Sequence, residues 1–233
     1  MIAQCQNRAI IQGMFQERFD KQMRCVIFGA GEYGNYDWKR EGNDYVIAAD
    51  GGLDELLKRN SLPNVLIGDM DSTVNESSME KLREQGVEIK KLPREKDDTD
   101  MLAAIKLGLE MDCEEFVIYG GIGGRLDHTI ANIQCLIYLK NRGKRAYLIG
   151  EKSITEIIRN ERKTFPKQMH GIFSAFAIGT EAKGVTESGF KYEVTRAVIQ
   201  QEFPIGISNE FTGQESYIEV EDGTLLLHVI ETE

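Results

Sequence analysis

Residues 116–141 read FVIYGGIGGRLDHTIANIQCLIYLKN: an apolar run, a glycine-rich turn and then a helical pattern. The run at 116–119 has the length of a buried strand, and Ile133, Leu136 and Ile137 have the spacing of a buried helix face. A strand that passes through glycines directly into a helix is typical of parallel α/β sheets. This stretch therefore predicts an α/β domain.

The same alternation continues on both sides of this stretch. Further apolar runs are expected to form strands at 25–28, 45–49, 65–67, 87–92 and 146–149. Helical patterns fall between them, most clearly at 53–60 and 98–111. We therefore expect residues 24–150 to form a mostly parallel sheet flanked by helices.

The pattern changes after about Gly150, where short β-rich runs separated by turns replace the helical periodicity. The runs at 217–220 and 225–230 flank Asp222 and Gly223, a pair that favours a tight hairpin turn. Residues 151–233 are therefore expected to form a β-sandwich domain. Residues 1–23 lie outside both patterns, and we expect an extension of unknown role there.

The overall composition argues against several classes of protein. A chain of 233 residues, 41% hydrophobic and 28% charged, is ordinary for a globular protein of one large or two modest domains. A net charge of −10 argues against nucleic-acid and anionic-membrane partners, which need a basic surface. No apolar run approaches the roughly 20 residues that span a bilayer. The four cysteines lack ligand-like spacing, which favours free thiols in a reducing cytoplasm.

Three acidic clusters each follow an apolar run: GDMDS at 68–72, DDTD at 97–100 and GGRLDH at 123–128. Carboxylates gathered at the carboxyl ends of buried strands repel one another and resist desolvation. A fold tolerates this cost when a cation lies among them, and beside phosphate the commonest such cation is Mg²⁺. The clusters therefore predict magnesium-dependent phosphate chemistry.

The first two clusters each have a structural alternative. Asp69 and Asp71 are two residues apart, so both carboxylates can reach one ion, although Asp71 and Ser72 could instead cap the helix that follows. In the second cluster one acid suffices as a helix cap. We expect Asp97 or Asp98 to be that cap, and Asp100 to face the ion.

The third cluster opens with the glycines of residues 120–124. Glycines let backbone amides approach an anion closely, and the start of a helix adds a favourable dipole. Arg125 is expected to grip phosphate oxygens with two parallel hydrogen bonds. Asp127 would either complete the metal shell or orient the attacking group, and His128 is expected at the helix start or the edge of the substrate.

A further glycine motif, Gly29, Gly31 and Gly34, matches the dinucleotide fingerprint GxGxxG, with Asp50 about 20 residues on. However, residues 35–42 are too polar and too few for the usual crossover helix. Asp50 is followed by two glycines and is better interpreted as a fourth acid at the end of a strand.

In this order, ADGG (49–52), GDMDS, DDTD and GGRLDH resemble the motifs of the thiamine pyrophosphokinase family. SGFKY at 188–192 and GISNEF at 206–211 extend the resemblance over about residues 24–230. The resemblance implies an enzyme that transfers diphosphate from ATP to the hydroxyl of thiamine and releases AMP, with Mg²⁺ as cofactor. It also implies nucleotide and metal binding by residues 24–150, thiamine binding by residues 151–233, and a homodimer with its active site at the subunit interface.

Carried over position by position, the resemblance assigns roles to residues of this chain. The expected metal ligands are Asp69, Asp71 and Asp100. The expected catalytic residues are Asp71, Asp100, Asp127 and Arg125. The nucleotide is expected to contact Asp50, Ser72, Thr99, Gly121, Gly123, Gly124 and Arg125. Thiamine is expected to contact His128, Tyr192, Ser208 and Asn209, with Tyr192 stacking where some members have tryptophan.

Two rival functions remain open at this point. A dinucleotide-dependent oxidoreductase would use Gly29, Gly31 and Gly34. A non-catalytic thiamine or nucleotide sensor would keep the fold, but it would have no need to keep the whole acidic set.

Overall fold

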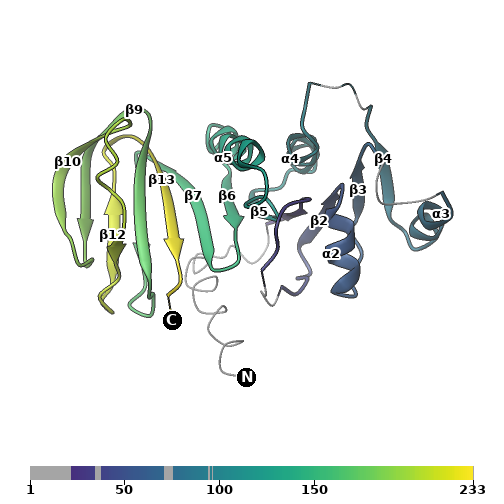
Figure 1. Ribbon diagram of the computed structural model, residues 1–233, viewed down its shortest axis with the longest axis horizontal. Coiled ribbons are helices and arrows are strands. Elements are labelled where there is room, and N and C mark those ends of the chain that lie inside the picture. Colours follow the sequence, from purple (N-terminus) through teal and green to yellow (C-terminus); the bar gives the residue numbers. More distant parts are fainter. Residues whose placement is uncertain (1–21, 35–37, 71–75, 94, 96, 233) are drawn as a thin grey trace. The chain divides into compact units, whose positions relative to one another are not determined.

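The structure is a computed structural model that describes residues 22–34, 38–70, 76–93, 95 and 97–232 (Figure 1). These residues divide into two compact units. The first comprises residues up to 150 except for a few around position 35, and the second comprises residues from 151 onward.

The first unit contains a six-stranded sheet in the order β4-β3-β2-β1-β5-β6, in which every neighbouring pair is parallel. Its strands are β1 Arg24–Phe28, β2 Asp44–Ala49, β3 Val65–Gly68, β4 Glu88–Lys91, β5 Glu115–Tyr119 and β6 Arg145–Ile149. All five residues of β1 and all four of β3 are buried, as expected when helices cover both faces of a sheet. The predicted parallel sheet is confirmed.

Among the described residues, four helices cover this sheet: α2 Gly52–Lys58, α3 Glu76–Glu84, α4 Asp100–Glu110 and α5 Leu126–Lys140. In Figure 1, α4 and α5 lie on one side of the sheet and α2 and α3 on the other. The predicted buried face of α5 was partly wrong, because Ile133 and Ile137 are only half-buried. The buried face is turned toward Asn132, Cys135, Leu136 and Leu139.

The strand order places a ligand site in this unit. From β1 the chain moves outward through β2, β3 and β4, then returns to β5 on the other side of β1. The loops after β1 and β5 therefore diverge, and open α/β sheets bind ligands in the crevice at such a switch point, beyond the carboxyl ends of the strands.

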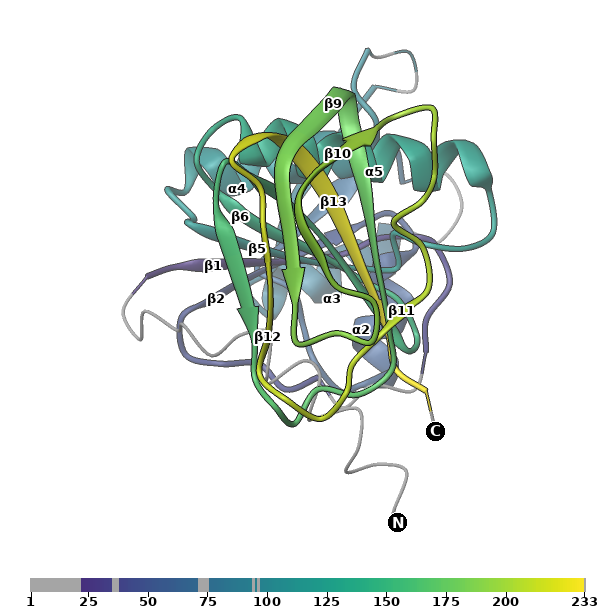
Figure 2. The same ribbon diagram turned by 90° about the vertical axis from the view of Figure 1, so that its left-hand side faces the viewer.

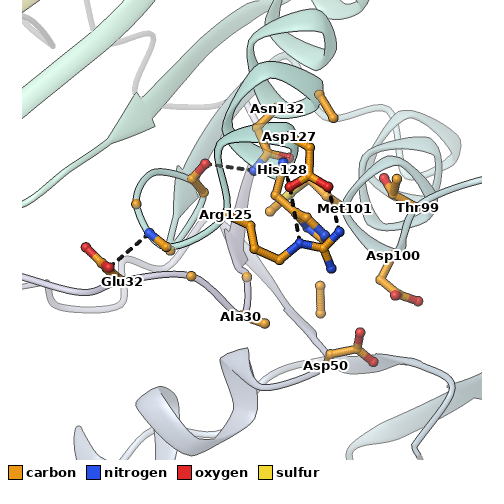
Figure 3. Close-up of a pocket in the computed structure, with 18 residues that line it drawn as sticks. Ala30, Glu32, Asp50, Thr99, Asp100, Met101, Arg125, Asp127, His128 and Asn132 are labelled. Atoms are coloured by element: carbon orange, nitrogen blue, oxygen red, sulfur yellow. Dashed lines mark hydrogen bonds and ion pairs between the residues drawn. The ribbon is translucent and has the colours of Figure 1, made fainter.

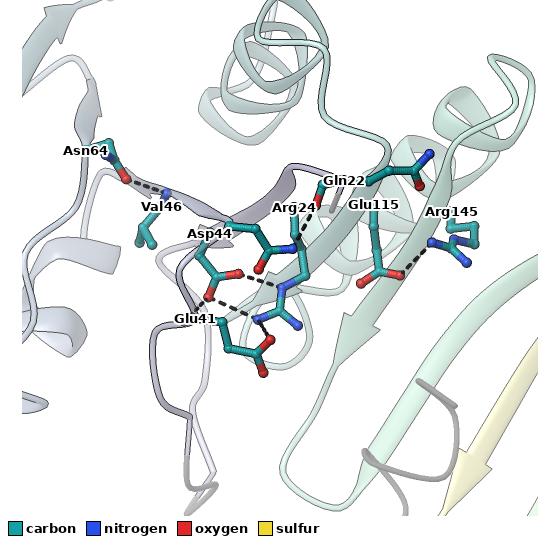
Figure 4. A network of polar contacts seen from close by, with 9 residues as sticks. Gln22, Arg24, Glu41, Asp44, Val46, Asn64, Glu115 and Arg145 are labelled. Atoms are coloured by element: carbon teal, nitrogen blue, oxygen red, sulfur yellow. Dashed lines mark hydrogen bonds and ion pairs between the residues drawn. The ribbon is translucent and has the colours of Figure 1, made fainter. Parts of the chain in front are cut away.

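The amino ends of the strands, opposite the switch point, carry a row of alternating charges (Figure 4). Asp44, Arg24, Glu115 and Arg145 are the first residues of four adjacent strands and pair in register. Arg24 donates to Asp44 through Nε at 2.7 Å and Nη2 at 3.0 Å, and Arg145 lies 3.4 Å from Glu115. The Asp44 carboxylate is fully buried. The row therefore holds the amino ends of the strands together, away from the switch point.

The second unit is antiparallel and β-rich. Its strands are β7 Ser153–Arg159, β8 Arg162–Phe165, β9 Ile172–Ser188, β10 Val194–Gln200, β11 Asn209–Glu210, β12 Ser216–Glu219 and β13 Asp222–Ile230. The long, bent β9 faces the viewer in Figure 2. Its first half pairs with β11 and β13, and its second half pairs with β10 and β12. An aromatic cluster formed by Phe165, Phe173, Phe190 and Phe211 packs beside these strands.

The hairpin predicted at residues 217–230 is wrong. β12 pairs with β8 and β9, whereas β13 pairs with β7 and β9. Asp222 and Gly223 are the first two residues of β13, and they do not form a turn between two paired strands.

Cys25, Cys113 and Cys135 are free and buried, and Cys5 lies outside the described residues. In the described part of the chain, no helix is long and apolar enough to cross a membrane.

Candidate active site

A cavity of about 730 Å³ opens at the switch point of the parallel sheet (Figure 3). It is lined by the loops after β1, β2 and β5 and by the first turns of α4 and α5. The predicted site residues on its wall are Asp50, Thr99, Asp100, Gly121, Gly123, Gly124, Arg125, Asp127 and His128. Asp50 and His128, which are 78 positions apart in the sequence, thus line one pocket.

The glycines of the apparent dinucleotide fingerprint bring two loops of this pocket together. Gly29 N donates to Tyr119 O and Gly31 N donates to Gly120 O, both at 2.8 Å. A Cβ on Gly31 would lie 2.5 Å from Gly120 O, so only glycine permits this approach. In the described residues β1 is followed by β2 with no helix between them. The motif therefore lacks the helix that a dinucleotide-binding unit needs.

The glycine loop after β5 is held from both sides by side chains. The buried Asn132 of α5 donates through Nδ2 to Gly121 O at 2.8 Å. From the loop after β1, Glu32 accepts a hydrogen bond from Gly124 N at 2.9 Å, across 92 residues of sequence. A Cβ on Gly123 would overlap the Glu32 carboxylate. A carboxylate therefore lies against the loop that was expected to receive phosphate.

Arg125 ends this loop, immediately before α5, and faces Asp127. Its Nε lies 3.1 Å from Asp127 Oδ1 and its Nη2 lies 2.5 Å from Oδ2. The hydrogen bond from Arg125 lowers the pKa of the Asp127 carboxyl below its ordinary value, and the Asp127 carboxylate raises the pKa of Arg125. Both side chains are largely exposed, so the pair can separate at little cost when a competing anion arrives.

The DDTD cluster divides its roles differently from the prediction. The cap of α4 is Thr99, whose Oγ1 accepts from Leu102 N at 3.1 Å, and not Asp97 or Asp98. Asp98 instead pairs with Lys106 at 2.5 Å. The hydroxyl of Thr99 reaches the third amide of the helix, which is the usual capping contact. Asp100, the first helical residue, lines the pocket.

Asp50 and Asp69 follow the neighbouring strands β2 and β3. Asp50 lines the pocket and has a left-handed backbone with φ of 47°. A Cβ on Gly68 would overlap Oδ1 of Asp50, so this carboxylate lies against the residue that precedes Asp69. In Figure 3, Asp50 and Asp100 lie on one side of the pocket and Glu32 on the other.

These carboxylates fit a magnesium ion in their chemistry. Mg²⁺ prefers oxygen ligands and usually takes one or two carboxylates together with substrate phosphates. Within the described ranges no group of three or more His, Cys, Asp or Glu side chains could hold a metal ion. Asp50 and Asp100, which lie on one side of the pocket wall, therefore match a site that a bound polyphosphate would complete. Asp71 and Ser72 lie outside the described residues.

The expected thiamine residues of the second unit form a group of their own. Tyr192 follows β9 and its side chain is 61% exposed. Its N–H donates to Asn209 Oδ1 at 3.0 Å, and its carbonyl accepts from Asn209 Nδ2 at 2.7 Å. Ser208, with φ of 61°, donates through its N–H to Ser174 Oγ at 3.1 Å. Asn209 is thus engaged within the chain, and it holds the backbone of Tyr192.

Sequence reasoning missed Glu32 and Asn132. Glu32 lies between Gly31 and Gly34, in the motif that matches the dinucleotide fingerprint without its helix. Asn132 is the easier of the two to predict from the sequence. A polar residue inside an apolar helical pattern is buried only when it has a hydrogen-bonding partner.

Comparisons with known proteins agree with this arrangement. Residues 38–148 match the family model "Thiamin pyrophosphokinase, catalytic domain", and residues 157–225 match "Thiamin pyrophosphokinase, vitamin B1 binding domain". Thiamine pyrophosphokinase of Bacillus subtilis is 25% identical over 182 residues, which cover 78% of this chain and 85% of that protein. Thiamin pyrophosphokinase 1 of Caenorhabditis elegans is 24% identical over 186 residues, covering 75% of this chain and 74% of that protein.

Solved structures show the same fold at low sequence identity. The crystal structure of the Bacillus subtilis thiamine pyrophosphokinase has a TM-score of 0.81 at 22% identity, covering 90% of this chain and all of that one. The thiamin pyrophosphokinase of Candida albicans has a TM-score of 0.72 at 15% identity, covering 89% and 90%. The resemblance predicted from the motifs is confirmed. With the catalytic and vitamin B1 binding models matched in sequence order, this chain belongs to the thiamin pyrophosphokinase family.

Proposed function

We propose that this protein transfers diphosphate from ATP to the hydroxyl of thiamine, giving thiamine diphosphate and AMP. The observation that carries the proposal is the match to both family domains, combined with a switch-point pocket whose wall holds carboxylates, glycines and an arginine. Transfers of this kind depend mainly on positioning and neutralisation of charge, so no strong general base is needed.

In this proposal the pocket of the first unit binds the polyphosphate of ATP. Backbone amides of the loop at residues 120–124 and the positive end of α5 attract its oxygens. Arg125 exchanges its exposed partner Asp127 for the transferred group, to which it offers two parallel hydrogen bonds. Before the anion arrives, the hydrogen bond from Arg125 lowers the pKa of Asp127, so Asp127 stays ionised and holds the guanidinium beside the pocket.

The proposed metal ligands are Asp69, Asp71 and Asp100, with Asp50 beside them. A magnesium ion held there would neutralise charge on the polyphosphate. Support comes from the position of Asp50 and Asp100 on the pocket wall and from the contact of Asp50 with Gly68.

Thiamine is proposed to stack on Tyr192. The ring is exposed and its backbone is anchored at both the N–H and the carbonyl, which suits a stacking platform. Lys191 Nζ lies 5.5 Å from the ring centre and is paired with Glu210 at 2.6 Å. A cation can therefore already approach this ring, and the thiazolium of thiamine is also a cation.

We further propose a homodimer with its active site at the subunit interface, in the cytoplasm. Large apolar side chains are exposed together along residues 192–207 of the second unit: Tyr192, Val194, Val198, Phe203, Ile205 and Ile207. Clustered exposure of this kind is typical of a protein interface. The free, buried thiols among the described cysteines support a reducing compartment.

The central experiment incubates the protein with ATP, Mg²⁺ and thiamine and identifies the products by chromatography. AMP and thiamine diphosphate in equal amounts support the proposal, and chelation of Mg²⁺ should abolish both. ADP as the product would refute it. A thiamine sensor would bind thiamine without releasing AMP in a single turnover. A dinucleotide oxidoreductase would bind NAD(P) or flavin and ignore Mg²⁺.

Light scattering in solution tests the dimer. Phe203→Glu should convert the dimer to a monomer, because it places a charge among the exposed apolar side chains. Leu57→Glu is the matched control, since Leu57 is 46% exposed on α2 and should tolerate the charge. A wild-type monomer at working concentration counts against this part of the proposal.

A further inference from the structure

Glu187 is a buried carboxylate in the unit that carries Tyr192. It lies near the end of β9, between β10 and β12, and is 6% exposed. A buried carboxylate is costly unless hydrogen bonds compensate it. Burial raises the pKa of Glu187, and a hydrogen bond from Asn209 acts in the opposite direction. Its partner is Asn209 Nδ2, at 2.7 Å.

The Asn209 side chain makes four hydrogen bonds. Nδ2 donates to Glu187 Oε2 and to Tyr192 O, each at 2.7 Å. Oδ1 accepts from Tyr192 N at 3.0 Å and from Glu210 N at 2.9 Å. A primary amide has two N–H donors and two acceptor positions, so all four are used. Asn209 is itself only 6% exposed, which leaves it no hydrogen-bonding group for a ligand.

Glu187 helps to fix which way this amide points. An ionised carboxylate only accepts hydrogen bonds, so it must face the NH₂ group. If the amide were rotated by half a turn, Oδ1 would face the carboxylate and Nδ2 would face the N–H of Tyr192. Both contacts would be repulsive. Glu187 therefore reinforces the orientation that the backbone of Tyr192 and Glu210 also requires, and its hydrogen bond helps to hold Asn209 against Tyr192.

We propose that Glu187 is a positioning residue for thiamine, acting through Asn209 to hold the backbone that carries the Tyr192 ring. The inference rests on the proposed function, because it takes Tyr192 as the stacking residue. A ring fixed before the ligand arrives loses less conformational entropy on binding. Loss of Glu187 should therefore weaken the use of thiamine and leave the use of ATP unchanged.

The test compares steady-state kinetics of the full-length wild type with Glu187→Leu and Glu187→Gln. Leucine removes the acceptor and should raise KM for thiamine about tenfold, with kcat and KM for ATP within about twofold. Glutamine keeps an oxygen that can accept from Asn209, so it should restore KM for thiamine to within about threefold of the wild type. Glu156→Leu is the matched control. Glu156 is an equally buried glutamate of β7, paired with Lys163, and should not affect KM for thiamine.

A second background separates positioning from general destabilisation. In Tyr192→Ala the ring is gone, so adding Glu187→Leu should raise KM for thiamine no further. An unchanged KM for thiamine in folded Glu187→Leu would overturn the proposal. An equal rise in KM for ATP, or a full additional effect in the Tyr192→Ala background, would do the same. If Glu187→Leu does not fold, Asn209→Ala is judged by these criteria.

Calorimetric binding of thiamine keeps this test separate from the proposed activity. If the wild type yields no AMP and no thiamine diphosphate, the proposed function fails. The positioning role is then still measured as an approximately tenfold loss of thiamine affinity in Glu187→Leu. If the wild type is active and Glu187→Leu binds thiamine equally well, the positioning role alone fails.

Discussion

Arg125 and Asp127 form a two-point ion pair at the mouth of the switch-point pocket, with separations of 3.1 and 2.5 Å. Both side chains are more than half exposed, so water and salt weaken the attraction between them. The ion pair therefore holds the Arg125 guanidinium beside the pocket, and an anion that binds the guanidinium more tightly can displace Asp127.

Replacement of Arg125 tests whether its guanidinium acts on the bound nucleotide. Arg125→Ala should lower kcat/KM for ATP by about a hundredfold to a thousandfold, the usual cost of losing one group that stabilises transition-state charge. Arg125→Lys should restore only part of the activity, because an ammonium cannot form two parallel hydrogen bonds. Thermal denaturation should be unchanged in both variants, since the pair is exposed. A pronounced fall in melting temperature would instead indicate a structural role.

Asp100 and Asp97 allow a matched test of metal binding within one cluster. Asp100 lines the pocket, whereas Asp97 is exposed and is not part of the pocket wall. Asp100→Asn should raise the Mg²⁺ concentration for half-maximal activity by about tenfold or more, because a neutral amide is a weaker ligand than a carboxylate. Asp97→Asn should leave the Mg²⁺ titration as in the wild type. Equal effects of the two variants would remove Asp100 from the metal site.

Glu32 and an incoming phosphate group would compete for the same hydrogen-bond donor, the backbone N–H of Gly124. Gly124 N already donates to Glu32, and the carboxylate would lie beside a polyphosphate of like charge. Glu32→Gln should therefore lower KM for ATP by about threefold to tenfold and leave KM for thiamine unchanged. Glu84→Gln, at the end of α3, is the control for loss of one negative charge. A rise in KM for ATP would show that Glu32 braces the loop and does not compete with the nucleotide.

Much of the α/β unit could be predicted because a parallel sheet covered on both faces needs strands that are apolar throughout. β1, β3 and β5 are therefore visible as unbroken runs. The antiparallel unit was harder. A turn sequence such as Asp222-Gly223 indicates a change of direction, but it does not show which strands pair. The 17-residue β9 pairs with different strands along its two halves, and this decided the outcome.

The sequence was sufficient to locate the site but not to predict the contacts within it. Strand-end acids and glycines mark the carboxyl edge of a sheet in any sequence of this kind. Which of several adjacent polar residues caps a helix depends on local backbone geometry. The sequence therefore does not show that Thr99, and not Asp98, caps α4. The contact between Glu32 and Gly124 joins residues 92 positions apart, and no local pattern indicates it.

The buried pair of Arg24 and Asp44 should contribute to stability and not to activity. Asp44→Ala leaves Arg24 without its main partner, and removing one member of a buried ion pair costs about 3–5 kcal/mol in the free energy of unfolding. Glu115→Ala, which breaks the longer and more exposed contact with Arg145, should cost about 1 kcal/mol or less. Urea denaturation measures both. Because the row lies at the amino ends of the strands, kcat/KM per folded molecule should stay at the wild-type value.

His228 should make the protein less stable in mild acid. It is half-buried on β13, with Nδ1 2.8 Å from Thr155 Oγ1, and desolvation lowers its pKa below the ordinary value of 6.5. The unfolded chain therefore takes up this proton at a higher pH than the folded one. The contribution of His228 to stability is complete above about pH 6.5 and is lost as the pH falls from there through its folded-state pKa.

Urea denaturation between pH 7.5 and 5.5 measures this dependence. His228→Gln should flatten the pH dependence of the free energy of unfolding, because glutamine has no proton to gain in this range. His170→Gln, at an exposed position, controls for the loss of a histidine and should keep the wild-type slope. If His228→Gln and the wild type lose stability in parallel on acidification, the buried imidazole is not the group responsible, and the loss must come from carboxylates that become protonated.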